Sequence, residues 1–123
     1  MNDYTDIPNY LKKFLINIDT IRGQSQKTSK EYYYDLRTFL RFLKIYSNLV
    51  DENANFNSIK IDDVSLDLIK TVDLNLLYEY MSYVNRKRGN SSSARARKIA
   101  SLRTFFKYLH TKANLIDENP TLE

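Results

Sequence analysis

Residues 91–112 read SSSARARKIASLRTFFKYLHTK, and this stretch decides the fold. Its apolar side chains recur at intervals of three and four residues, which is the period of an α-helix with one buried face. The stripe consists of Ile99, Leu102, Phe106, Leu109 and Ala113, with Phe105 at its edge. Serine is a favoured N-cap residue, so we expect one of Ser91, Ser92 and Ser93 to begin a helix that runs to about Lys112.

The opposite face of this expected helix alternates small side chains with cations. A helical wheel places Ser93, Arg97, Ala100 and Thr104 at its centre and Ala96, Ser101, Arg103 and Lys107 beside them. Small side chains let a helix approach another surface closely, and a helix fits the major groove of B-DNA. The N-terminus of a helix also favours phosphate. The pattern indicates a DNA-binding face, and the alternative is an ordinary surface helix with an alanine-rich exterior.

Outward from this stretch, the chain carries three more strong helical patterns, over residues 8–21, 28–47 and 73–88. Thr28-Ser29-Lys30-Glu31 has the form of a capping box at the start of the second, and Asp73 is suited to cap the third. A short helix is expected at residues 66–70. The sequence therefore predicts an all-α fold of four to five helices.

The connection over residues 49–72 is long for a compact domain. Its first part, residues 51–55, is polar and expected to be exposed. Ile59, Ile61 and Val64 are apolar, so we expect them to hold the connection against the bundle.

The second helix repeats the division into a core face and a cationic face. Tyr32, Leu36, Phe39, Leu40 and Leu43 form the core face, whereas Tyr34, Arg37, Thr38, Arg41 and Lys44 form the outer face. The run Tyr32-Tyr33-Tyr34 also indicates an alternative function, in which tyrosine rings stack on the bases of a single-stranded nucleic acid. Only Tyr34 is expected to point outward, which argues against this alternative. The ten candidate DNA contacts on the two helices are Thr28, Lys30, Tyr34, Arg37, Arg41, Ser93, Arg97, Arg103, Thr104 and Lys107.

The charges of the 123-residue chain are segregated along the sequence, although the net charge is only +4. The stretch from Tyr80 to Ile116 has nine lysines and arginines and no acidic residue. Residues 49–79 are acidic by contrast. A polyanion relieves the self-repulsion of such a basic segment, so nucleic acid is the expected partner, and the alternative is a solvated basic face. The helix faces described above favour double-stranded DNA.

Several function classes fit the composition poorly. The chain has no cysteine and one histidine, His110, which leaves no thiolate or multi-histidine metal site. We expect no cofactor and no catalytic residue, and we expect Asp62-Asp63 to be exposed or to cap the short helix. No apolar run approaches the ~20 residues of a membrane span, and the polar, acidic N-terminus is unlike a signal peptide. A cytoplasmic protein is expected.

The run from Ala96 to Leu109, followed by Ile116-Asp117-Glu118-Asn119-Pro120, resembles the end of the core-binding domain of tyrosine recombinases. This is the SAM-like N-terminal domain of phage integrases and Xer-type recombinases, an orthogonal helical bundle. The segment from Thr28 to Leu36 and the helix at 73–88 fit the same pattern.

The resemblance implies that the domain binds one face of a recombination half-site through its second and fourth helices. It singles out Thr28, Arg97 and Arg103 as DNA contacts. It also implies a core-binding domain over residues 1–118, a linker beginning at 119–123, and a separate catalytic domain that supplies the tyrosine nucleophile. Full-length protomers would meet in a synaptic tetramer, and the domain alone is expected to be monomeric. A protein-interaction bundle and a free-standing DNA-binding regulator are the alternatives.

Overall fold

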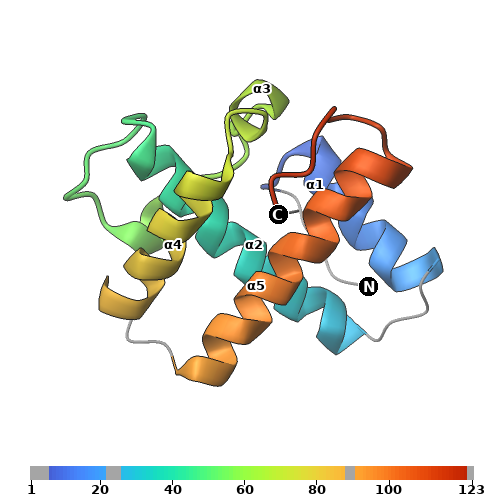
Figure 1. Cartoon of the computed structure of the whole chain (residues 1–123), viewed down its shortest axis with the longest axis horizontal. Coiled ribbons are helices and arrows are strands. Elements are labelled where there is room, and N and C mark those ends of the chain that lie inside the picture. Colours follow the sequence, from blue (N-terminus) through green and yellow to red (C-terminus); the bar gives the residue numbers. More distant parts are fainter. Residues whose placement is uncertain (1–5, 22–25, 88–90, 122–123) are drawn as a thin grey trace. The chain divides into compact units, whose positions relative to one another are not determined.

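The regular structure of the chain is helical. The computed structural model describes residues 6–21, 26–87 and 91–121, and within these ranges it has five α-helices, three short helical turns and no strand (Figure 1). The all-α prediction is confirmed. The chain divides into two compact units, Met1–Ser65 and Leu66–Glu123, each of which is described by itself.

The first unit is built on α1 (Asn9–Ile16) and α2 (Gln26–Tyr46), which pack against each other. Pro8 precedes α1 in an extended conformation, and α1 continues into a π-helical turn, η1 (Asn17–Ile21). The ring of Phe14 meets that of Tyr32 edge-on, with 5.7 Å between the centroids. The buried apolar side chains of these helices are Tyr10, Leu11, Phe14, Leu15, Ile18, Leu36, Phe39, Leu40, Phe42 and Leu43.

The start of α2 differs from the prediction. The helix begins at Gln26, so Thr28 and Glu31 lie inside its first turns and do not form a capping box at its end. A capping box would use the Thr28 hydroxyl to accept the N–H of Glu31. Because the helix begins at Gln26, that N–H already has a backbone carbonyl one turn earlier as its acceptor.

The end of α2 lies where it was predicted, next to Ser47 and Asn48. Asn48 has a φ of 60°, in the left-handed region that asparagine tolerates better than most residues. The N–H of Leu49 then donates to the carbonyl of Lys44 at 2.9 Å, and the N–H of Asn48 donates to that of Ile45 at 3.0 Å. This pattern closes the last turn of the helix.

The long connection after α2 is held by its apolar residues, as expected. Ile59, Ile61 and Val64 are buried, and a 3-10 turn, η2 (Phe56–Ser58), precedes them. The hydroxyl of Tyr10 donates a 2.7 Å hydrogen bond to the carbonyl of Val64. This bond joins the start of α1 to the end of the connection.

The second unit contains α3 (Leu66–Ile69), α4 (Leu74–Lys87) and α5 (Ser92–Lys107), followed by a π-helical turn, η3 (Tyr108–Lys112). Asp73 caps α4 by accepting the N–H of Leu76 at 2.8 Å, and Ser91 caps α5 by accepting that of Ala94 at 3.2 Å. The cap at Asp73 was predicted, and Ser91 is one of the three serines expected to begin the last helix. The buried apolar residues of the unit are Ile69, Val72, Leu76, Leu77, Tyr80, Val84, Leu102, Phe105, Phe106, Leu109 and Ile116.

The chain after η3 turns back within the second unit. Asn114 has a φ of 54°, and the N–H of Leu115 donates to the carbonyl of Leu109 at 2.8 Å. Nδ1 of His110 lies 3.2 Å from the carbonyl oxygen of Ile116. Because a carbonyl only accepts, this contact requires the proton on Nδ1. His110 therefore anchors the returning segment.

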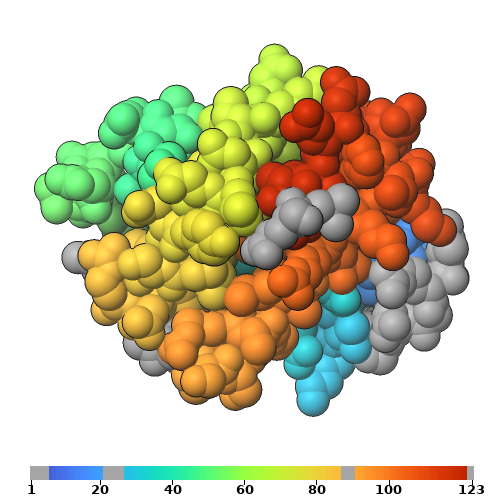
Figure 2. Space-filling model, viewed as in Figure 1, coloured from blue at the N-terminus to red at the C-terminus, as the bar shows by residue number. Residues whose placement is uncertain are grey.

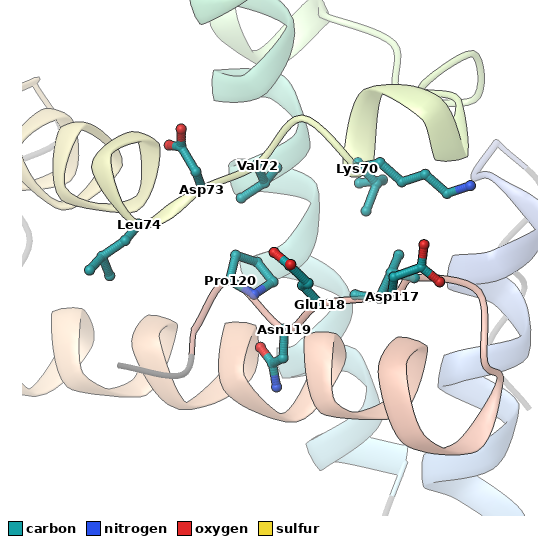
Figure 3. Close-up of a pocket in the computed structure, with 10 residues that line it drawn as sticks. Lys70, Val72, Asp73, Leu74, Asp117, Glu118, Asn119 and Pro120 are labelled. Carbon is teal, nitrogen blue, oxygen red and sulfur yellow. The ribbon is translucent and has the colours of Figure 1, made fainter.

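The returning segment forms one wall of a pocket of about 450 Å3 (Figure 3). Lys70, Val72 and Asp73 line the opposite wall, and residues 117–120 face them. Asn119 Oδ1 accepts both the N–H and the hydroxyl of Thr121, at 2.9 and 2.6 Å. The segment expected to begin a linker thus has an ordered local turn up to Thr121.

Candidate nucleic-acid interface

The exposed side of α5 gathers cations and small side chains on one helix face. Ser93, Ala96, Arg97, Ala100, Arg103 and Lys107 are all exposed, and Thr104 is half-buried. Figure 2 shows α5 in orange along the visible surface. Five of the predicted site residues, Ser93, Arg97, Arg103, Thr104 and Lys107, therefore lie on or beside a single accessible face.

The face is rotated relative to the predicted helical wheel. Ser101 was placed on the outer side but is buried, and Lys98 is buried as well, whereas Ile99 is only half-buried. The reason is that Phe105 and Phe106 are both fully buried, which moves the centre of the core face toward Phe105. The exposed face consequently centres on Ala96, Ala100 and Lys107, with Arg97 and Arg103 on its two flanks.

The start of α5 is fixed to α4 by an arginine that was not among the predicted site residues. Arg95 donates from Nη1 to Oδ1 of Asn85 at 3.0 Å and from Nη2 to the hydroxyl of Ser92 at 3.2 Å. These bonds join the last turn of α4 to the first turn of α5. They position the N-terminus of α5, where unpaired amide groups and the helix dipole favour an anion.

The predicted face on α2 is only partly exposed. Lys30 and Tyr34 are exposed, whereas Thr28, Arg37 and Thr38 are half-buried. The guanidinium carbon of Arg37 lies 5.3 Å from the ring centroid of Tyr33 and 5.0 Å from that of Tyr34. Arg37 is therefore held over two aromatic rings, which fixes its orientation.

The placement of Arg41 and Lys44 on the outer face was wrong, because both side chains are buried. Arg41 donates from Nε to the carbonyl of Ile59 at 2.9 Å and from Nη2 to that of Asn57 at 3.0 Å. A helical wheel of α2 alone could not show this, since the connection that buries the two cations comes later in the chain.

Lys44 fixes the same connection at a second point. Its ammonium lies 2.8 Å from the carbonyl oxygen of Lys60 and 2.8 Å from Oδ1 of Asp63. The hydrogen bond from Lys44 lowers the pKa of the Asp63 carboxyl below its ordinary value of 3.8. Asp63 is exposed, as predicted, and its partner gives it a structural role.

Other kinds of site find no support in the part of the chain that the structure describes. Within residues 6–21, 26–87 and 91–121, no group of three acidic or histidine side chains is placed to hold a metal ion. Among the same residues, no helix is long and apolar enough to cross a membrane.

The comparisons with known proteins define the class. The family described as phage integrase, N-terminal SAM-like domain, matches residues 11–113. The chain belongs to this family, which confirms the resemblance to the N-terminal domain of tyrosine recombinases drawn from residues 96–109.

The individual relatives described next are both named tyrosine recombinases. The chain is 48% identical over 116 residues to tyrosine recombinase XerC of Caldanaerobacter subterraneus subsp. tengcongensis, covering 94% of this chain and 33% of that protein. It is 31% identical over 99 residues to tyrosine recombinase XerD of Listeria monocytogenes serotype 4b, covering 80% of this chain and 27% of that protein. The chain thus spans about a third of the length of these curated relatives. No solved structure gives a significant match.

Proposed function

We propose that the chain is the duplex DNA-binding domain of a site-specific tyrosine recombinase and grips one recombination half-site. The observation that carries this proposal is the exposed face of α5, where three cations alternate with small side chains. The major groove of B-DNA admits an α-helix, and the short side chains of Ala96 and Ala100 let the backbone of α5 come close to it.

The residues of α5 divide into two roles within this proposal. Arg97 and Arg103 flank the small residues, so each can reach a base edge or a phosphate on its own side of the groove. Lys107, Ser93 and Thr104 bind phosphate oxygens, which orient the helix on the duplex but carry no sequence information. The acid-free stretch from Tyr80 to Ile116 supports the same assignment, because nothing in it would repel the backbone.

The second helix, which belongs to the first unit, carries its own set of proposed DNA contacts. Thr28, Lys30, Tyr34 and Arg37 stay in the proposed interface, since each is exposed or half-buried. Arg41 is left out of it, because its guanidinium is buried and bonded to the connection.

The remaining parts of the proposal concern the whole protein. The relatives are named tyrosine recombinases and are about three times as long, so we place strand cleavage in a region beyond these 123 residues. This chain, a core-binding domain over 1–118 with a linker from 119, would act in the cytoplasm as a binding module and not as an enzyme. The domain alone would be a monomer.

A protein-contact role is the second candidate, and one observation favours it. A small apolar groove between α4 and α5 is lined by Leu77, Met81 and Leu102, and the neighbouring Tyr78 is 59% exposed. Such a groove suits contact with another protomer when full-length proteins assemble on DNA. A Tyr78→Ser variant would keep DNA affinity but lose assembly if this second role holds.

The proposal is tested by titrating a labelled duplex with a variant that loses the α5 cations. Arg97→Gln, Arg103→Gln and Lys107→Gln together should weaken binding at least tenfold. The matched control removes three exposed lysines elsewhere, as Lys12→Gln, Lys13→Gln and Lys70→Gln, and should weaken it much less. Equal losses in both triple variants would mean that net charge, and not this helix face, determines the affinity.

A further inference from the structure

One pocket of the first unit combines cations in a way that the fold does not explain. It lies between α2 and the connection that follows, has a volume of about 330 Å3, and is lined by Arg37, Arg41 and Lys60 together with Tyr33, Asn57 and Ser58. Since a water molecule takes about 30 Å3 of liquid, the pocket has room for one phosphate group and several waters.

The two arginines of this pocket differ in what the fold gives them. Arg41 is bonded to two carbonyls of the connection, so its charge is fixed in place by structure. Arg37 makes no hydrogen bond from Nε, although that atom is buried, and among the described residues it forms no ion pair. A buried N–H without a partner is costly, so the fold alone does not account for Arg37.

The aromatic neighbours of Arg37 prepare it for a ligand. The guanidinium carbon of Arg37 lies 5.3 Å from the ring centroid of Tyr33 and 5.0 Å from that of Tyr34, so the two rings hold it in place. A planar guanidinium held in this way loses little freedom when it binds, and its fork geometry matches the oxygens of phosphate. Lys60, an exposed residue of the connection after α2, also lines the pocket, although no sequence pattern indicated that this connection takes part in binding.

Two carboxylates, Asp6 and Asp62, also line the pocket. They lower its positive potential but do not cancel it, because three cationic residues line the same pocket. They also make it unsuited to a dense polyanion such as a triphosphate, so the pocket favours one phosphate group at a time.

We propose that this pocket is an oxyanion site that takes a single phosphate group, with Arg37 and Lys60 as its ligands and Arg41 as a fixed charge behind them. The inference rests on the proposed function to the extent that the phosphate belongs to the backbone of the bound duplex. It adds the connection after α2, through Lys60, to the DNA-binding surface.

The first experiment measures duplex binding over a range of salt concentrations for the unmodified chain, Lys60→Gln, and Lys12→Gln as the control. Both lysines are exposed and lie in the same unit, so both variants should fold and lose one charge. Lys60→Gln should weaken binding three- to tenfold and bring the slope of log K against log salt about 1 closer to zero. Lys12→Gln should change neither by a comparable amount. If the two variants behave alike while the unmodified chain binds DNA, the phosphate site is overturned and the proposed function stands.

The second experiment separates backbone phosphate from free phosphate. Inorganic phosphate is titrated into the chain at constant ionic strength while the NMR signal of the Arg37 Nε–H is followed. A saturating shift at Arg37, absent at Arg103 and abolished by Lys60→Gln, supports the site even if no duplex is bound, in which case the proposed function fails and the ligand is free phosphate. If the chain binds no duplex and the Arg37 signal does not move, the site is overturned together with the proposed function.

Discussion

Nε of Arg41, on α2, donates a hydrogen bond of 2.9 Å to the carbonyl oxygen of Ile59, in the connection that follows the helix. One turn further along α2, the ammonium of Lys44 donates to the carbonyl oxygen of Lys60 and to Oδ1 of Asp63 in the same connection. Two of the cations on this helix are therefore used to hold the connection in place. A buried side chain with carbonyl partners contributes to stability and is poorly placed to meet DNA.

Replacing Arg41 should affect folding more than binding. Arg41→Met keeps much of the apolar stem but leaves the carbonyls of Ile59 and Asn57 without their donor, which should lower the free energy of unfolding by about 1–3 kcal/mol. Lys30→Met, on the same helix but exposed, should change it by less than about 0.5 kcal/mol. Urea unfolding of the two variants makes the comparison, and equal midpoints would contradict the structural role of Arg41.

The Lys44–Asp63 pair should make stability depend on pH. Because the pKa of Asp63 is lowered in the folded state, the pair stabilises the fold above the ordinary carboxyl range, and this contribution is lost as the pH falls through the folded pKa. Asp63 is 66% exposed, so the contribution should stay below about 1 kcal/mol.

The measurement for this pair is the urea midpoint of the unmodified chain and of Asp63→Asn between pH 7 and pH 3. The unmodified chain should be the more stable at pH 7, and the difference should narrow toward pH 3. If the difference in stability between the two chains grows as the pH falls, Asp63 does not stabilise the fold through its ion pair with Lys44.

Two substitutions in α5 should separate binding from folding. Phe106 is fully buried, so Phe106→Ala should cost roughly 3–5 kcal/mol of stability. Arg97 is exposed, so Arg97→Ala should change stability by less than ~0.5 kcal/mol while weakening DNA binding. Thermal melts and duplex titrations on both variants provide the check. Early melting of Arg97→Ala with full binding would mean that the binding face of α5 is misassigned.

The contribution of the Asp73 cap on α4 to stability should be measurable by thermal melts. Asp73 accepts the N–H of Leu76 at 2.8 Å, so Asp73→Ala should cost about 0.5–2 kcal/mol. Asp67 is an exposed aspartate in the first turn of α3, and Asp67→Ala serves as the control for loss of a negative charge. Asp73→Ala should melt well below the control, and coinciding melting curves would rule out a capping contribution.

Most elements of the fold could be predicted because they depend on local signals, although α2 begins earlier than predicted. The caps at Asp73 and Ser91 and the stop at Asn48 involve residues within a few positions of one another. Periodicity also placed Leu36, Phe39, Leu40 and Leu43 of α2 in the core, and all four are buried, although Tyr32 is only half-buried.

The exposed site residues were harder to predict, because packing between different parts of the chain decides which side chains are buried. Arg41 and Lys44 are buried by a segment more than ten residues away, and the face of α5 is turned because two adjacent phenylalanines are both buried. The contribution of Lys60 to the pocket with Arg37 had no sequence signal either, since it depends on how the connection folds back on α2.

The most direct test of the account is the salt dependence of duplex binding by the unmodified chain. If about four to six phosphates are contacted, log K should fall against log salt with a slope of roughly −4 to −5. A slope near zero, or no binding at low salt, would contradict the claim that this domain grips DNA through its cationic faces.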